Sequence, residues 1–142
     1  MKIGELAKRT GCDVETIRYY EKSGLLEEPP RSAAGYREYK DGHQERLQFI
    51  RHCRSLQIGL ADIRLLLELK SNPAAGCDGV NDLLDHHIER IKGQMESLRL
   101  LQEQLLALRH QCATPQSIQE CAIMQNLSEA AGDQDCVCHP TP

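Results

Sequence analysis

The chain has 142 residues, enough for one domain or for a small domain joined to an oligomerisation element. Its formal net charge of −4 argues, taken alone, against a nucleic-acid partner, but the charge is unevenly distributed. Residues 1–70 hold 13 Lys and Arg against 11 Asp and Glu, whereas residues 71–142 hold 4 against 10. Such a split is typical of a DNA-contacting region attached to a part with another function.

The seven cysteines could belong to a secreted disulfide scaffold, but other features argue against that class. Their number is odd and their spacings are wide. The segment MKIGELAKRT is polar and amphipathic, without the apolar core of a signal peptide, and no run reaches transmembrane length. We therefore expect a cytoplasmic protein, not associated with a membrane, whose thiolates bind metal.

The first residues contain the pattern of a helix-turn-helix. Ile3–Thr10 predicts a short amphipathic helix, Gly11 marks a tight turn, and Asp13 is a good N-cap for a second helix over residues 14 to about 23. Two short helices joined by a Gly-containing turn form this motif, which also occurs in proteins that do not bind DNA. The polar residues near the start of the second helix, which would point into the major groove, are Thr16, Arg18 and Tyr19.

The residues after the second helix predict a β-hairpin. A glycine ends the helix, a pair of prolines favours extended structure, and the hairpin would turn near residues 33–35. Tyr36 and Arg37 follow the turn, so a basic, aromatic wing would stand beside the second helix and donate hydrogen bonds to phosphate. An ordinary solvated hairpin is the alternative. The wing and the helix pair belong to an expected DNA-binding domain, residues 1–70.

Two further helices are expected in this domain. Asp41 followed by Gln44 resembles a capping box for a helix to about residue 56, and another helix would cover residues 61–70. The apolar positions expected to face inward are Leu47, Phe49, Ile50, Ile63, Leu66 and Leu67. The cysteines of this domain are assigned as small core residues rather than as metal ligands, and they are Cys12 and Cys53.

Residues 71–79 form a linker containing Pro and Gly, and a long helix is expected over residues 80–112. Its apolar residues recur every three or four positions, which keeps one face apolar over about 42 Å. This stripe consists of Leu84, Ile88, Ile91, Met95, Leu98, Leu101, Leu105 and Leu108. A stripe so long and narrow needs a second copy of itself, as an antiparallel or parallel coiled-coil seam, because no other long helix remains to cover it. A core helix of a bundle is the alternative.

Cysteines lie at both ends of this helix. Cys77 precedes it, Cys112 falls in its last turn, and Cys121 lies in the segment that follows. About 45–50 Å separates the two helix ends, so the cysteines at opposite ends of one chain cannot share a ligand. In an antiparallel pair, each chain's Cys77 end would lie beside its partner's Cys112 end, forming two three-thiolate sites. Residues 113–127 would then be a metal-binding loop and short helix, in an arrangement that suits a sensor.

The C-terminal residues 128–142 are small, polar and acidic, and we expect them to be disordered. They end in a Cys/His group that could bind a soft metal only incidentally. Alternatively, this group could form an accessory site with a histidine of the long helix and pass metal to the three-thiolate site. The residues concerned are Cys136, Cys138, His139, His86 and His87.

Several segments resemble the DNA-binding domain of MerR-type regulators. They are IGELA from position 3, VETIRYYE from position 14, GLL from position 24 and GYREY from position 35. The resemblance covers residues 1–127. Within this family, GC at position 76 followed by VN at position 80, LDHHI from position 84 and CAIM from position 121 resemble the cadmium- and lead-responsive branch, which is CadR- and PbrR-like.

The resemblance implies a mainly α fold: a winged helix-turn-helix domain, a long antiparallel coiled-coil dimerisation helix and a short C-terminal metal-binding loop. It also implies a homodimer on a pseudo-palindromic operator inside a promoter whose elements are too far apart. The metal-free dimer represses, and metal lets it distort the DNA so that RNA polymerase can use the promoter. The family's DNA contacts fall on Thr16, Arg18, Tyr19, Tyr36 and Arg37, and its metal ligands on Cys77, Cys112 and Cys121.

The expected effector is Pb(II) or Cd(II), because three soft thiolates suit large, thiophilic ions. Hg(II) and Zn(II) are alternatives within the family. The loop between Cys112 and Cys121 has no His or Cys, unlike that of zinc-sensing members, and the cysteine at position 77 replaces the serine of copper sensors.

Two classes outside the family are also open. An enzyme is disfavoured, because the sequence has no Gly-rich phosphate loop and no recognisable nucleophile arrangement. A cytoplasmic metal-sequestering thiol protein would explain the cysteines, but it would leave Arg18, Tyr19 and the wing without a function.

Overall fold

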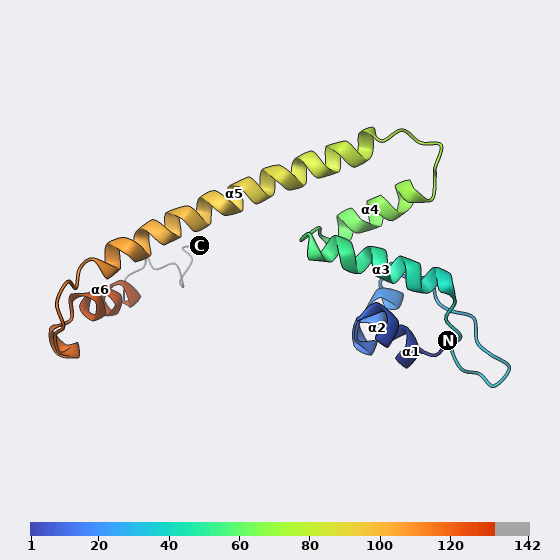
Figure 1. The fold of residues 1–142 in the computed structure, drawn as a ribbon, viewed down its shortest axis with the longest axis horizontal. Coiled ribbons are helices and arrows are strands. Elements are labelled where there is room, and N and C mark those ends of the chain that lie inside the picture. Colours follow the sequence, from blue (N-terminus) through green and yellow to red (C-terminus); the bar gives the residue numbers. More distant parts are fainter. Residues whose placement is uncertain (133–142) are drawn as a thin grey trace. The chain divides into compact units, whose positions relative to one another are not determined.

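The structure is a computed structural model, and it describes residues 1–132 (Figure 1). The elements in chain order are α1 (Ile3–Thr10), α2 (Val14–Lys22), α3 (Asp41–Ser55), α4 (Leu60–Lys70), α5 (Asp78–Arg109), the 3-10 helix η1 (Ile118–Glu120) and α6 (Ala122–Ala131). The predicted mainly α fold is confirmed, and the described residues contain no strand. The predicted tail group of Cys136, Cys138 and His139 lies outside the described residues.

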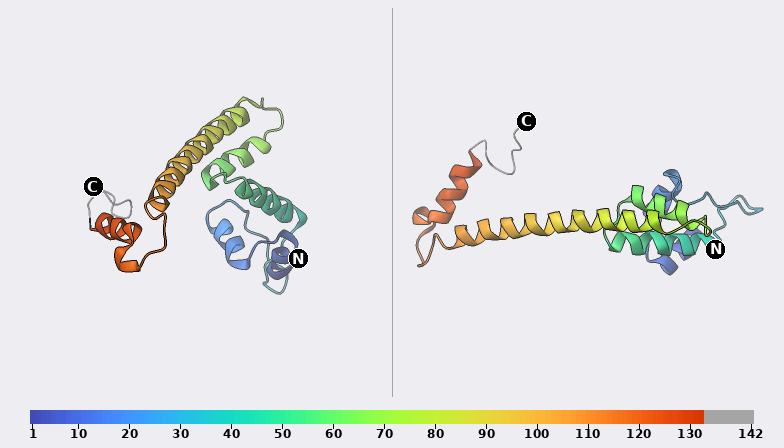
Figure 2. Two further views of the ribbon diagram at one scale, coloured as in Figure 1. Left: turned by 60° about the vertical axis from the view of Figure 1, so that its left-hand side comes forward. Right: turned by 90° about the horizontal axis from the view of Figure 1, so that it is seen from above.

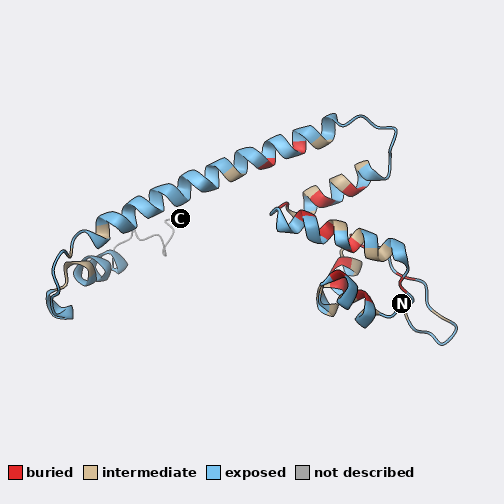
Figure 3. Cartoon of the chain, viewed as in Figure 1, coloured by how far each residue is buried: buried red, intermediate tan, exposed pale blue. Residues whose placement is uncertain are grey.

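The chain forms two compact units, residues 1–87 and the residues from 88 onward, and α5 contributes to both. In the first unit, α1 packs against α2 and α3, and α3 packs against α4. One apolar side of each helix supplies the core, as the buried positions of Figure 3 show. The fully buried side chains are Leu6, Ile17, Leu25, Leu26, Tyr39, Leu47, Ile50 and Ile63.

The predicted core positions of α3 and α4 are confirmed. Leu47, Ile50, Ile63 and Leu67 are buried, while Phe49 and Leu66 are partly buried and pack against the core. The two cysteines of this unit also behave as core residues: Cys53 is buried, and Cys12 is partly buried against the same cluster.

The start of α2 is capped as predicted. The Asp13 carboxylate accepts a hydrogen bond from the backbone N–H of Thr16 at 2.7 Å, and this bond lowers the pKa of Asp13. A carboxyl with a lowered pKa in the folded state stabilises the fold above its unfolded pKa, and this contribution is lost as the pH falls through the folded pKa. Gly11, which ends α1, has a φ of 69°, and a side chain there would collide with the Arg51 guanidinium.

The start of α3 differs from the prediction. Lys40 is the N-cap, and its backbone N–H donates a hydrogen bond to Nδ1 of His43 at 3.0 Å. Asp41 is already the first helical residue, so its carboxylate lies in the first turn. There it interacts favourably with the helix dipole but does not cap the helix.

Arginines of α3 and α4 tie the helix-turn-helix together. Arg51 donates to the carbonyl of Thr10 at 2.8 Å, Arg64 to that of Ser23 at 2.6 Å, and Arg46 to that of Leu25 at 2.6 Å. Carbonyls at and just beyond a helix C-terminus lack intrahelical partners, and a cation there is also favoured by the helix dipole. These arginines therefore link α1 and the end of α2 to α3 and α4.

The predicted β-hairpin is wrong as a pair of strands. Only one antiparallel bridge forms, between Arg31 and Arg37. Within this bridge the backbone N–H of Ser32 donates a hydrogen bond to the carbonyl of Tyr36 at 2.6 Å. Gly35, in the turn, has a φ of 84°. The ladder cannot extend on the N-terminal side because the preceding two prolines have no N–H, and Tyr39 donates instead to the carbonyl of Met1 at 2.8 Å. We call the resulting loop, residues 31–37, the wing loop.

The beginning of α5 packs within the first unit through a leucine outside the predicted stripe and through His87, which the sequence had offered as a possible accessory metal ligand. Leu83 and His87 are buried, and His87 Nε2 donates to the carbonyl of Leu56 at 2.8 Å. Leu56 is the C-cap of α3, so the imidazole satisfies a helix-terminal carbonyl. The helix then continues without a break to Arg109 (Figure 2).

The C-terminal helix is longer than predicted. α6 continues through Ser128 to Ala131, so the expectation of disorder from residue 128 is wrong for this stretch. Residues 129–131 are Glu-Ala-Ala, which are good helix formers, and the hydroxyl of Ser128 donates to the carbonyl of Met124 at 2.8 Å. Among the described helices, none has the length and hydropathy that crossing a membrane requires.

The two faces of α2 can be separated by mutation. Ile17 is fully buried, so Ile17→Ala should lower the free energy of unfolding by about 2–5 kcal/mol. Tyr19, on the same helix, is 56% exposed, so Tyr19→Ala should change it by less than about 0.5 kcal/mol. Urea denaturation of both variants measures this. Equal losses would contradict the assignment of the exposed face.

Candidate nucleic-acid interface and metal-ligating thiols

The second helix presents one face to the core and one to solvent. Ile17 and Tyr20 are buried, whereas Arg18 and Tyr19 are exposed and Thr16 is partly buried. Burial raises the pKa of Tyr20, which keeps its phenol neutral in the core. The exposed face of α2 therefore carries the polar residues expected of a recognition helix.

A basic groove of about 290 Å³ lies where α2 meets the wing loop. Four of the residues that line it are cationic, and among the described residues no carboxylate lines it. The lining residues are Lys2, Ile3, Arg18, Arg31, Gly35, Tyr36 and Arg37. Three predicted DNA contacts, Arg18, Tyr36 and Arg37, thus come together in one place. A second depression, of about 460 Å³, is lined in part by the other two, Thr16 and Tyr19.

Lys2 and Arg31 of the basic groove were missed by sequence reasoning. Lys2 Nζ lies 5.3 Å from the centre of the Tyr36 ring, and Arg31 donates to the carbonyl of Gly35 at 3.0 Å. Arg31 could have been found, because it faces Arg37 across the predicted hairpin. Nothing in the pattern marked Lys2. Four neighbouring cations attract the phosphate backbone of DNA, and such contacts set the orientation of a protein on the duplex.

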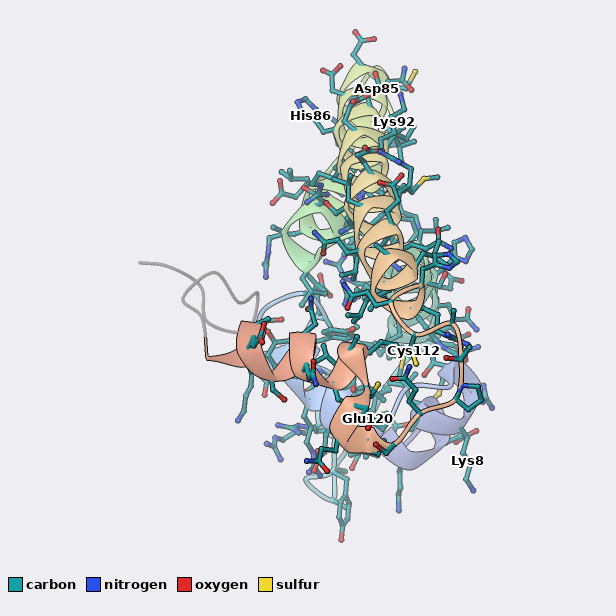
Figure 4. The ribbon with its side chains drawn as sticks, turned by 90° about the vertical axis from the view of Figure 1, so that its left-hand side faces the viewer. Lys8, Asp85, His86, Lys92, Cys112 and Glu120 are labelled. Carbon is teal, nitrogen blue, oxygen red and sulfur yellow. The ribbon has the colours of Figure 1, made fainter. Side chains whose placement is uncertain are left out.

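The three predicted metal ligands lie at the ends of α5 and at the start of α6. Cys77 is exposed, Cys112 is partly buried and donates its thiol hydrogen to the carbonyl of Thr114 at 3.3 Å, and Cys121 is the partly buried N-cap of α6. Figure 4 places Cys112 and Glu120 in the connection between α5 and α6. The five cysteines in the described part of the chain are all free thiols.

A single chain does not assemble these thiols into a site. Within residues 1–132, no group of three or more His, Cys, Asp or Glu side chains could hold a metal ion. α5 has 32 residues, which at 1.5 Å per residue makes it about 48 Å long. Cys77 and Cys112 lie at its opposite ends, so any site that uses both must draw them from different chains.

The apolar stripe of α5 is uncovered in the single chain. Met95, Leu98 and Leu105 are 65%, 64% and 58% exposed. Beside the stripe, charged residues pair among themselves: Lys92 with Glu89 at 3.2 Å, and Arg99 with Glu96 and Glu103. An exposed apolar stripe flanked by charged pairs is the pattern of a helix that pairs with another helix.

The profile described as "MerR HTH family regulatory protein" matches residues 1–70, and that described as "MerR, DNA binding" matches residues 44–108. The chain belongs to the MerR family. It is 43% identical over 109 residues to the ZntR homolog of Haemophilus influenzae, a match that covers 77% of this chain and 81% of that relative.

Two solved structures of MerR-family regulators are similar over almost their whole length. PbrR691 from Ralstonia metallidurans CH34, in complex with lead(II), is 44% identical with a TM-score of 0.79, over 89% of this chain and 98% of that one. MerR from Bacillus megaterium MB1, in complex with mercury(II), is 34% identical with a TM-score of 0.70, over 90% and 99%.

The family membership decides between the classes that the sequence left open. Regulators of this family bind promoter DNA as homodimers, so the predicted partners are confirmed at the level of the family. This chain is a metal-responsive transcriptional regulator of the MerR family and not an enzyme.

Arg18→Ala should weaken binding to the operator by about 1–3 kcal/mol, since the side chain is exposed on α2 and lines the basic groove. The operator for this test is a pseudo-palindromic duplex selected from a random-sequence pool with the wild-type dimer. Fluorescence anisotropy at several salt concentrations measures the loss. If Arg18 contacts phosphate, the loss is equal for unrelated DNA and the salt slope falls by about one. An unchanged affinity would remove Arg18 from the interface.

Leu98→Glu should raise the dissociation constant of the dimer by about tenfold or more, because a carboxylate would replace an apolar contact in the seam. Ala107→Glu is the matched control. Position 107 is also exposed but lies nine residues away, or two and a half turns, on the opposite side of α5. Sedimentation velocity measures both. Equal dissociation constants for the two variants would contradict a seam along the stripe.

Proposed function

We propose that this regulator senses Pb(II) or Cd(II) through two equivalent sites, each built from Cys77, Cys112 and Cys121 of two antiparallel chains. The observation that carries this proposal is one continuous helix with free thiols at both ends and an uncovered apolar stripe between them. Antiparallel pairing of two such helices would cover the stripe and bring the partner's Cys77 to the Cys112 end of each chain.

The donor set fits a soft metal. Cys77 is exposed, and the thiols of Cys112 and Cys121 are partly exposed, so an ion can reach them without unfolding a core. Thiolate sulfur selects thiophilic ions over the hard, oxygen-preferring ones. The likeness to PbrR691, whose structure contains lead(II), supports lead as the effector. A bound metal would join thiolates of both chains and so couple its occupancy to the arrangement of the dimer.

The sensor would act by changing the shape of promoter DNA. Arg18, Tyr36 and Arg37 in the basic groove, with Thr16 and Tyr19 on the exposed face of α2, would hold each half of the dimer on one half-site. The metal-free dimer then represses the promoter. Metal binding shifts the dimer toward a form that bends and untwists the DNA, at a cost of a few kcal/mol, so that RNA polymerase can use both promoter elements. The regulated genes would be those for heavy-metal resistance.

A mercury- or zinc-responsive sensor is the alternative within the family. The similarity to MerR in complex with mercury(II) and to a ZntR homolog favours it. A metal-sequestering thiol protein of another class would not need the basic groove or an exposed face on α2. All of these alternatives use the same three thiols and differ in the metal or in the need for DNA.

Replacing any one of the three cysteines by Ser should abolish induction while operator affinity stays within about threefold, less than about 0.7 kcal/mol. The reason is that one metal site needs all three thiols, and Cys112 and Cys121 lie outside the unit that carries the basic groove. A promoter-reporter dose series with Pb(II), Cd(II), Hg(II) and Zn(II) measures induction, and fluorescence anisotropy measures DNA binding.

Cys53→Ala is the matched control for these variants. It removes a thiol that is buried in the core of the first unit, so the metal response should persist. A normal response from Cys77→Ser would contradict the three-thiolate site. Induction by Hg(II) or Zn(II) at lower doses than Pb(II) and Cd(II) would move the assignment to the alternative sensor.

A further inference from the structure

A buried carboxylate lies beneath the basic groove. Glu21, near the end of α2, has a side chain only 7% exposed, although it belongs to the unit that would face DNA. One carboxylate oxygen, Oε1, accepts a hydrogen bond from the Tyr39 hydroxyl. The other, Oε2, lies 3.7 Å from Nη1 of Arg37. Both partners come from the chain in and just after the wing loop.

The Tyr39 contact is a fixed anchor. Its side chain is fully buried, and burial raises its pKa, with the hydrogen bond to Glu21 raising it further. The phenol therefore stays protonated and donates to the carboxylate throughout the physiological pH range. This bond fixes one carboxylate oxygen of Glu21, and the second oxygen lies beside Arg37.

Arg37 pairs with Glu21 through one side of its guanidinium and is exposed to solvent on the other. Its Nη1 pairs with Glu21, its side chain is 37% exposed, and it lines the groove together with Arg18. Its Nε is buried and, within the described residues, has no hydrogen-bond partner. The buried Nε cannot reach DNA, but the exposed part of the guanidinium lies beside three other cations, where a phosphate oxygen is a suitable acceptor.

We propose that Glu21 is a positioning residue for DNA binding. Its carboxylate holds the Arg37 guanidinium in the groove beside Arg18. The wing loop and α2 can then contact the same stretch of phosphate backbone. This inference rests on the proposed role of the groove as a DNA contact. Without the carboxylate, Arg37 would sample several rotamers, and binding DNA would have to restrict them again.

Simple electrostatics makes the opposite prediction, which allows a clear test. Removing a negative charge next to four cations should strengthen their attraction for phosphate. If Glu21 positions Arg37, removing its charge should weaken binding instead. The sign of the change in operator affinity therefore distinguishes a positioning carboxylate from one that merely reduces the positive charge of the surface.

The test uses Glu21→Gln in the full-length dimer, with the selected operator duplex as the probe. The amide keeps the side-chain volume and an oxygen acceptor for Tyr39 but loses the charge that holds Arg37. We expect operator affinity to fall by about tenfold in fluorescence anisotropy at low salt. In an Arg37→Ala background the same substitution should change affinity by less than about twofold, because the group that it positions is gone.

Two control variants separate positioning from charge and from folding. Glu5→Gln removes a carboxylate on α1 that is half exposed and pairs with Arg9 at 2.6 Å, so it should leave operator affinity unchanged or slightly increased. Tyr39→Phe removes the hydroxyl that anchors Glu21, so it should weaken operator binding in the same direction as Glu21→Gln but by a smaller factor, and by less than about twofold in the Arg37→Ala background. If Tyr39→Phe weakened operator binding equally in the presence and in the absence of the Arg37 side chain, the carboxylate would be structural and the inference wrong.

The remaining outcomes are also decisive. Unchanged or tighter operator binding by Glu21→Gln would overturn the inference, and so would an equal loss in the Arg37→Ala background. The proposed function fails separately, if the wild-type dimer binds no duplex from the pool in preference to unrelated DNA of the same length.

Discussion

The helix α5 imposes the constraint on which the rest of the protein depends. Its first turns are anchored on the first unit by burial of Leu83 and by the hydrogen bond from His87 to the carbonyl of Leu56. Burying one leucine contributes about 1.5–3 kcal/mol. Beyond His87 the helix presents apolar residues that no part of the described chain covers. A second copy of the chain would cover this stripe, as expected in a family whose regulators bind DNA as homodimers.

The first unit divides its positive charges between two tasks. Arg46, Arg51 and Arg64 donate hydrogen bonds to backbone carbonyls at or just beyond helix ends. These bonds link α1 and the end of α2 to α3 and α4. Lys2, Arg18, Arg31 and Arg37 line the groove and remain accessible to a ligand. Net charge alone could not separate these groups, because the count of basic residues does not say which carbonyls lie within reach. The net charge of the whole chain is negative, yet the groove is basic.

A three-thiolate site shared between chains would give this architecture its switch. Each chain brings thiols at positions that it cannot join by itself, so occupancy would report on the pair and not on the monomer. The effect on the promoter would then require only a modest preference of the metal for one arrangement of the dimer. A ligand that bound both arrangements equally would shift nothing, however tightly it bound.

Local chemistry by itself determined much of this protein. The Asp13 cap, the glycine at the end of α1 and the spacing of Ile63 and Leu67 specify helices and buried faces through interactions within a few residues, and the exposed stripe of α5 follows from its period. Tertiary structure decided the rest. It reduced the predicted hairpin to one bridge because Tyr39 pairs with Met1, and it brought Lys2 to Tyr36 and Glu21 to Arg37. These contacts join residues 16 to 38 positions apart, and no periodic pattern encodes which distant side chains will meet, because that depends on how the helices pack.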